Sequence, residues 1–161
     1  MAKYKRDIKE IKKIIVHCSD SDNPKHDTIN VIRQWHKLLG WDDVGYHFFI
    51  RKSGEIQKGR QLYFEGAHCL GENHDSVGIC LSGRKEFKEK QFKSCALLIH
   101  DLVDVLGWNM HGREWIDVVF PHNHFNKHKT CPNFPIEKVL HFSDQQLIDY
   151  KENEYYNMRN L

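Results

Sequence analysis

The feature of this sequence that most constrains its fold is a short apolar run that ends abruptly on a histidine. Residues 14–16 are all β-branched, and His17 opens a polar segment directly after them. Short apolar runs of this composition are typical of buried β-strands. A side chain at the end of such a strand is held rigidly by the sheet while it stays open to a cleft. The sequence therefore predicts a buried strand over residues 12–17 that presents His17 at its end.

Further apolar strands alternate with amphipathic helices along the chain. The other predicted strands cover residues 46–51, a short segment near Ile56, residues 77–81 and residues 116–120, the last broken by Pro121. The predicted helices cover residues 29–39 behind a Thr28 cap, residues 89–106, residues 136–142 and residues 144–153. Interspersed strands and helices indicate an α/β fold, a single domain with a central mixed β-sheet flanked by helices. We expect one domain over residues 1–161, with a core over about residues 12–142 and a C-terminal helical tail over residues 143–161.

Size and charge exclude several classes of protein. A chain of 161 residues is long enough for one domain with a sizeable core, and 40% hydrophobic with 29% charged residues is ordinary for a globular protein. The net charge is only +2 and the basic residues are dispersed, so no nucleic-acid partner is expected.

The charged N-terminus lacks the apolar core of a signal peptide, and no apolar run approaches the roughly 20 residues that cross a bilayer. We expect synthesis in the cytoplasm and no membrane insertion.

The cysteine pattern narrows the choice of site. Five cysteines are an odd number and include no C-x-x-C pair, which disfavours a disulfide framework and a four-cysteine structural zinc site. Cys80 and Cys95 fall within apolar patterns, and strand alternation turns Cys18 away from His17, so all three are interpreted as small buried residues. Cys131 lies in a loop beside lysines that would favour its thiolate. It is the cysteine we expect to bind a metal.

Histidines, lysines and Cys131 are concentrated within residues 121–132. Two imidazoles and a thiolate suit zinc, whereas magnesium and calcium prefer oxygen ligands. With three protein ligands, the fourth position of a tetrahedral zinc ion stays open for a water whose pKa zinc lowers to about 7. The residues predict one hydrolytic zinc per chain, bound by His17, Cys131 and one histidine of the segment over residues 121–132. A structural zinc site, closed by His124 or His128 as a fourth ligand, is the alternative.

Six motifs occur in a fixed order between about residues 12 and 137. They are Ile14-Ile15-Val16-His17-Cys18-Ser19, Ile32-Arg33-Gln34-Trp35-His36, Gly40-Trp41-Asp42-Asp43-Val44-Gly45-Tyr46-His47-Phe48, Gly66-Ala67-His68, Asn73-His74-Asp75-Ser76-Val77-Gly78-Ile79-Cys80-Leu81-Ser82-Gly83 and Lys129-Thr130-Cys131-Pro132-Asn133-Phe134. Together they resemble the zinc-dependent N-acetylmuramoyl-L-alanine amidases, which include amidase-type phage lysozymes and the related peptidoglycan-recognition proteins. The resemblance implies a mixed sheet flanked by helices, zinc in a surface cleft, and cleavage of the amide between N-acetylmuramic acid and L-alanine in peptidoglycan.

The resemblance also implies roles for individual residues. The matching zinc ligands are His17, His122 and Cys131, and the matching catalytic residues are Tyr46 and Lys129. His68 matches a cleft histidine, for which we expect a substrate-facing position.

The segment that carries the second histidine ligand departs from the family pattern. The stretch from His122 to Cys131 is about one residue longer than in the family, and Pro121 stands where glycine is common. His124 is therefore an alternative ligand. We favour His122, because it directly follows the predicted strand.

Chemistry supports the two catalytic assignments. Amide hydrolysis needs an activated water, a polarised carbonyl and stabilisation of the tetrahedral oxyanion. Lys129 can place a cation beside the developing negative charge, and the hydroxyl of Tyr46 can orient water or substrate by hydrogen bonding.

We expect a monomeric endolysin of the phage type that acts on the cell wall after its release, with peptidoglycan as its substrate. The competing interpretation is a recognition module that binds peptidoglycan without cutting it. Modules of that kind typically lack the cysteine ligand, so Cys131 favours the enzyme.

Overall fold

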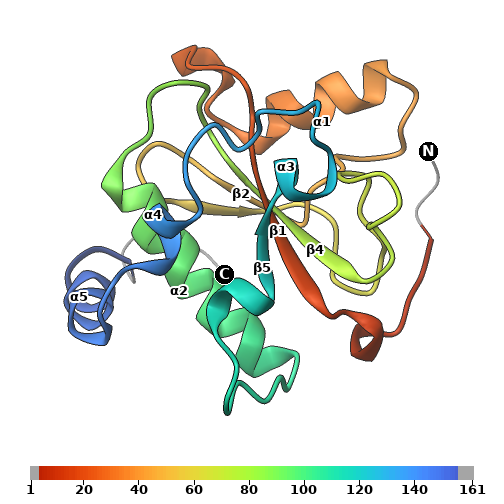
Figure 1. Cartoon of the computed structure of the whole chain (residues 1–161). Helices are drawn as coiled ribbons and strands as arrows, with labels where there is room; N and C mark the ends of the chain where they lie inside the picture. Colours follow the sequence, from red (N-terminus) through yellow and green to blue (C-terminus); the bar gives the residue numbers. More distant parts are fainter. Residues whose placement is uncertain (1–3, 156–161) are drawn as a thin grey trace.

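A five-stranded sheet forms the centre of the computed structural model, which describes residues 4–155 (Figure 1). The strands are β1 (Lys13–Cys18), β2 (Phe48–Ile50), β3 (Ile56–Lys58), β4 (Ser76–Leu81) and β5 (Val119–Pro121). Their order across the sheet is β3-β2-β4-β1-β5. The β1 strand pairs in parallel with β4 and β5, β2 pairs in parallel with β4, and β2 and β3 are antiparallel. The predicted central mixed sheet is confirmed.

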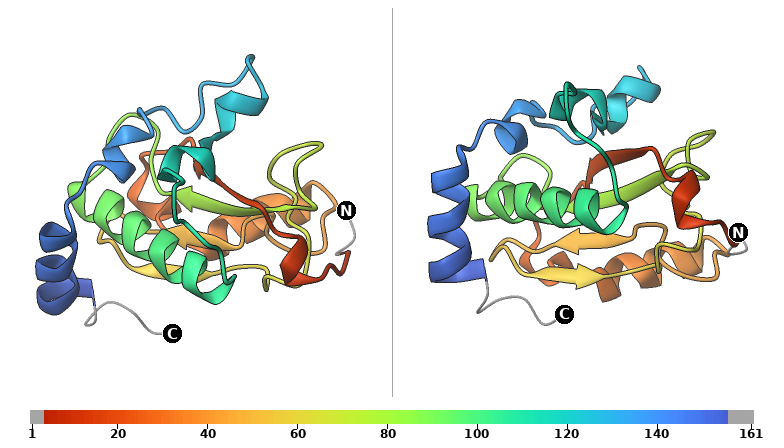
Figure 2. Two further views of the ribbon diagram at one scale, coloured as in Figure 1. Left: turned by 60° about the horizontal axis from the view of Figure 1, so that its bottom comes forward. Right: turned by 90° about the horizontal axis from the view of Figure 1, so that it is seen from below.

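Helices cover both faces of this sheet, as Figure 2 shows. The helices are α1 (Ile29–Leu38), α2 (Glu89–Val105), the one-turn α3 (His122–Phe125), α4 (Glu137–Leu140) and α5 (Asp144–Tyr150). Short 3₁₀ turns occur at Ile8–Glu10, Pro24–His26 and Trp115–Asp117, and a π-helical turn occurs at Lys151–Tyr155. The α1 helix lies against one face and α2 against the other, with α4 and α5 packed on α2. This arrangement confirms the predicted α/β fold of a single domain.

Side-chain alternation divides the core into two layers. Ile14 and Val16 of β1 belong to the layer under α2, whereas Phe49 and Cys80 belong to the layer under α1. Successive residues of a strand point to opposite faces of the sheet. His17, the next residue after Val16, therefore projects on the face that α1 covers.

The predicted start of α1 is confirmed, whereas the predicted limits of the last strand are not. Thr28 caps α1 by accepting a hydrogen bond from the backbone N–H of Asn30 at 3.4 Å. The predicted strand over residues 116–120 is wrong in its limits, because Trp115–Asp117 forms a 3₁₀ turn and Pro121 is the last residue of β5. Proline is tolerated there because β5 is an edge strand, where a missing N–H removes no central ladder bond.

The C-terminal helices are shorter than predicted but contribute to the core. Leu147 and Tyr150 of α5 are each only 5% exposed and lie in the layer under α2. The part of the predicted tail beyond residue 155 lies outside the described residues. Within residues 4–155, no helix combines the length and the apolar character needed to span a membrane.

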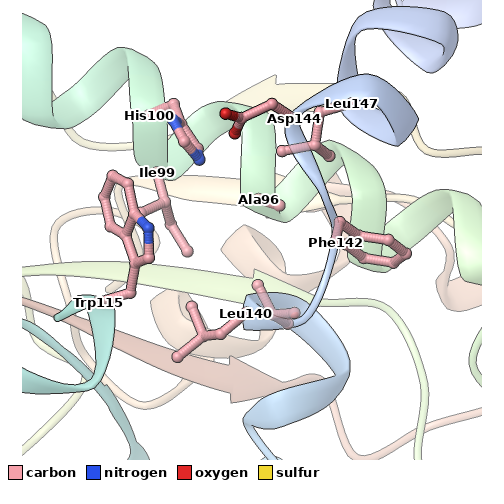
Figure 3. Close-up of a pocket in the computed structure, with 9 residues that line it drawn as sticks. Ala96, Ile99, His100, Trp115, Leu140, Phe142, Asp144 and Leu147 are labelled. Atoms are coloured by element: carbon pink, nitrogen blue, oxygen red, sulfur yellow. The ribbon is translucent and has the colours of Figure 1, made fainter.

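A small cavity separates α2 from the segment that carries α4 and α5 (Figure 3). His100 of α2 and Trp115 face each other across one side of it, with ring centroids 4.4 Å apart. Its volume is about 40 Å³, which is room for a single water molecule. The cavity lies in the layer under α2, away from the face on which His17 projects.

A buried histidine and a buried arginine join the N-terminal segment to the sheet. Nδ1 of His47 accepts a hydrogen bond from the N–H of Gly78 at 3.0 Å, and Nε2 donates to the carbonyl of Phe64 at 2.9 Å. Arg6 donates to the carbonyl of Ser76 at 2.7 Å and lies 3.1 Å from Nε2 of His47. Burial, reinforced by the cation of Arg6, lowers the pKa of His47 to about 3.

The layer under α1 has a central aromatic ring whose removal tests this packing. Phe49 is fully buried, so Phe49→Ala is expected to lower the free energy of unfolding by about 3–5 kcal/mol, because it leaves a cavity. Leu38→Ala is the control, since Leu38 is 85% exposed, and it should change stability by less than about 0.5 kcal/mol. Urea denaturation measures both values. Equal effects of the two substitutions would contradict the described core.

The depressed pKa of His47 predicts a loss of stability in acid. Between pH 6.5 and about 3 the unfolded chain binds a proton at this histidine that the folded protein excludes, so stability falls as the pH falls. By about pH 4 the loss from this group is on the order of 3 kcal/mol. Urea denaturation of the zinc-free protein at several pH values in this range measures the free energy of unfolding. This free energy should depend less on pH for His47→Gln than for the wild type. His111→Gln, at an exposed histidine, should keep the wild-type dependence; an unchanged dependence in His47→Gln would contradict the assignment.

Candidate metal centre

The pairing of β1 with β5 places two histidines side by side. Val16 lies opposite Pro121 in the parallel register, so the residues that follow them, His17 and His122, are neighbours. Their ring centroids are 4.5 Å apart. His17 is 1% exposed at the end of β1, and His122 is partly buried at the first position of α3. The carboxyl edge of the parallel strands therefore joins two imidazoles from distant parts of the chain.

The loop after α3 returns Cys131 to the same point. The N–H of Asn123 donates to the carbonyl of Cys131 at 3.0 Å, which closes this loop onto the start of α3. The Sγ atom of Cys131 lies 3.9 Å from Nδ1 of His17 and accepts a hydrogen bond from the N–H of Cys18 at 3.2 Å. The ligand atoms of His17, His122 and Cys131 all lie within 4.8 Å of one another. We call these three residues the donor set.

The chemistry of the donor set fits zinc. Two imidazole nitrogens and one sulfur, without a carboxylate, match a borderline-soft ion of tetrahedral preference. The hydrogen bond from the N–H of Cys18 can stabilise negative charge on the sulfur. Cys18 itself is buried, as expected, and lies outside the donor set, but its side chain contacts Cys131 and lines a neighbouring pocket.

The expectation that neighbouring lysines favour the thiolate of Cys131 is wrong. A hydrogen bond with the side chain of Cys18, together with burial, raises the pKa of the Cys131 thiol. Lys127 and Lys129 are both exposed, and the effects of Cys18 and burial on the Cys131 thiol dominate.

The structure brings His122, rather than His124 or His128, into the donor set. His124 is exposed, and its ring contacts the rings of Phe120 and Phe125, each with a centroid distance of 4.9 Å. His122 and His124 belong to one helical turn, where residues two apart point in different directions. His128 is also exposed. Neither His124 nor His128 lies where it could complete a four-ligand site.

Two pockets adjoin the donor set and have His122 and Lys129 in common. The first, of about 290 Å³, is called the aromatic pocket and is lined by Trp41, Ala67, His68, Cys69, Leu70, Asn73, His122, Asn126 and Lys129. The second, of about 240 Å³, is called the polar pocket and is lined by Cys18, Ser19, Asp20, Tyr46, His122, Lys129, Thr130, Cys131 and Asn133. An extended substrate could therefore lie across the donor set with one part in each pocket.

Both residues expected to act in catalysis line the polar pocket. The ring of Tyr46 lies 5.1 Å from that of His17, between centroids. Burial raises the pKa of the Tyr46 hydroxyl well above its ordinary value, so the hydroxyl stays protonated and can donate a hydrogen bond. The Lys129 side chain is exposed at the junction of the two pockets. Burial and the nearby charge of Lys129 lower the pKa of His122, which keeps its imidazole neutral.

His68 lines the aromatic pocket, but both of its ring nitrogens already have partners. Nδ1 lies 2.8 Å from Nε2 of His17, and Nε2 lies 3.2 Å from Oγ of Ser76. Sequence reasoning did not single out Ser76 or Trp41. Both residues lie within motifs that carry the family resemblance, which was an available signal for each of them.

Comparison with known proteins identifies the family. The family model described as N-acetylmuramoyl-L-alanine amidase matches residues 7–134. The chain is 34% identical over 133 residues to the endolysin of Escherichia phage T7, a match that covers 78% of this chain and 82% of that protein.

Solved structures of similar proteins agree with this family. The N-acetylmuramoyl-L-alanine amidase LysC from Clostridium intestinale URNW has a TM-score of 0.69 at 28% identity, over 83% of this chain and 85% of that one. Drosophila PGRP-LB shares the fold, with a TM-score of 0.67 at 22% identity over 96% of this chain and 86% of that one. The chain therefore belongs to the N-acetylmuramoyl-L-alanine amidase family.

Proposed function

We propose that this protein is a zinc-dependent amidase of the phage endolysin type, which hydrolyses the bond between N-acetylmuramic acid and L-alanine in peptidoglycan. The observation that carries this proposal is the donor set, whose three ligand atoms lie within 4.8 Å of one another between two pockets. Family membership and the similarity to phage endolysins support the substrate and the reaction.

His17, His122 and Cys131 would hold one zinc ion per chain. When bound there, zinc supplies a Lewis acid for the scissile carbonyl and lowers the pKa of the attacking water. The three side chains come from two strand ends and a closed loop, so the fold fixes them before any ion arrives. Their neutral imidazoles leave lone pairs available for coordination.

Lys129 and Tyr46 would handle the charge and the protons of the reaction. The ammonium group of Lys129, at the junction of the two pockets, can stabilise negative charge that develops on the carbonyl oxygen. The protonated hydroxyl of Tyr46 can donate a hydrogen bond to substrate or water in the polar pocket. His68 stays our prediction for a residue that faces the substrate from the aromatic pocket.

The biological role follows from the same similarity. A protein of this type is made in the cytoplasm, is released to the cell wall during lysis and works there as a monomer on peptidoglycan. We assign the catalytic core to about residues 12–142, followed by a C-terminal tail over residues 143–161.

Dependence on zinc and on one particular histidine tests the proposal. A chelator should abolish the release of stem peptides from purified peptidoglycan, and added zinc should restore it. His122→Ala is expected to lose bound zinc and to reduce activity by at least about 100-fold, because one of three ligands is removed. Metal analysis after gel filtration and a peptide-release assay measure the two effects.

His124→Ala is the matched control, because His124 lies in the same helical turn but outside the donor set. It should retain zinc and activity. Loss of zinc in His124→Ala with retention in His122→Ala would contradict the assigned ligand, and an inactive zinc-loaded wild type would contradict the enzyme.

The catalytic assignments predict variants that keep zinc and lose turnover. Lys129→Ala should lower kcat by about 10²–10³-fold, because the cation beside the oxyanion is lost. Tyr46→Phe should lower kcat by about 10²-fold, because only the hydroxyl is removed. Lys127→Ala, at an exposed lysine outside both pockets, is the control and should keep the wild-type kcat. A zinc-loaded Lys129→Ala enzyme with normal kcat would exclude this lysine from catalysis.

A further inference from the structure

We propose that His68 and Ser76 form a positioning pair that fixes the proton of the His17 imidazole on Nε2 and so leaves Nδ1 free to bind the metal. A role toward the metal presupposes the zinc-binding function proposed above. It adds residues that the donor set does not contain, and it explains why both ring nitrogens of His68 are engaged.

A backbone carbonyl group determines which atoms donate and which accept in this chain of hydrogen bonds. Ser76 Oγ lies 2.6 Å from the carbonyl oxygen of Glu72, and a carbonyl oxygen can only accept. The single hydroxyl proton of Ser76 is therefore used in that bond. The contact of 3.2 Å between Ser76 Oγ and Nε2 of His68 then requires the proton to lie on His68.

The hydrogen bond between His68 and His17 has a direction that follows from the proton on His68. A neutral imidazole carries one N–H, so Nδ1 of His68 is left as an acceptor. The contact of 2.8 Å between Nδ1 of His68 and Nε2 of His17 is then a bond that His17 donates.

This donation determines which nitrogen of His17 can coordinate. With its proton on Nε2, the ring has its lone pair on Nδ1, and Nδ1 is the nitrogen that lies 3.9 Å from Sγ of Cys131. A proton on Nδ1 instead would have to be displaced before a metal could bind. Residues that orient a histidine ligand in this way typically change metal affinity by about 10- to 100-fold when they are removed.

Two glycines hold the His68 ring in the required position. A Cβ atom at Gly78 would lie 2.6 Å from Cγ and Cδ2 of His68, closer than real side chains approach. A Cβ atom at Gly66 would collide with Cδ2 of the same ring. The ring therefore fits between two stretches of backbone that lack side chains. Such a close fit favours one fixed orientation, as a positioning residue requires.

The test measures proton location and zinc affinity in the full chain. Long-range ¹H–¹⁵N spectra of the zinc-free wild type should place the His17 proton on Nε2. His68→Phe keeps a ring between the glycines but removes the acceptor, so zinc affinity in a chelator competition should fall by about 10- to 100-fold. His68→Asn, whose side-chain oxygen stands near the position of Nδ1, should recover most of that loss. His111→Phe, at an exposed histidine remote from the site, should bind zinc as the wild type does.

Ser76→Ala provides a second variant in case His68→Phe does not fold. It keeps the imidazole and removes the acceptor for its Nε2 proton, so zinc affinity should fall here too, by less. Unchanged affinity in every variant that folds, or a proton on Nδ1 of His17 in the wild type, would overturn the proposal. A raised KM at unchanged zinc affinity would also overturn it and leave His68 with a substrate contact alone. If the wild type binds zinc but leaves peptidoglycan intact, the proposed function fails while the affinity measurements still decide the positioning role.

Discussion

The parallel pairing of β1 with β5 is the interaction on which the site depends. The N–H of Ile14 donates to the carbonyl of Val118 at 2.8 Å, and the register that begins there ends with Val16 opposite Pro121. His17 and His122 follow directly, so their proximity results from strand pairing alone. A shift of one residue would turn every side chain of β5 to the other face and separate the two imidazoles.

The two layers of the core differ in size and in their contact with the site. The layer under α2 contains most of the buried aliphatic side chains, including those of α4 and α5. The layer under α1 is smaller and adjoins the site. Tyr46 packs against this layer and also contacts His17. Substitution within either layer should therefore affect folding, and substitution at the edge of the layer under α1 can also displace the donor set.

Much of this fold could be predicted from the sequence, because its central elements carry strong local patterns. The β-branched run before His17 and the long apolar stripe of α2 are such patterns. The end of β5 could not be predicted in the same way. Pro121 reads locally as a strand breaker, and only the edge position of β5 in the assembled sheet makes it acceptable.

The site shows the same contrast. The position of His17 at a strand end and the chemistry of Cys131 were accessible from residue types. The preference for His122 over His124 rested on where the predicted strand ends, and it could be checked only against the end of β5 and the start of α3. The hydrogen bonds of His68 could not be predicted from the sequence, because they depend on a narrow space between Gly66 and Gly78. Only tertiary packing creates this space.

The central claim is that a zinc ion held by the donor set cleaves the bond between the sugar and the stem peptide. Mass spectrometry of the soluble products from purified peptidoglycan, digested by the zinc-loaded protein, tests it most directly. The expected products are stem peptides that begin with a free L-alanine amine, together with glycan strands of unchanged sugar linkage. Glycan fragments with new reducing ends, or stem peptides still attached to N-acetylmuramic acid, would contradict it.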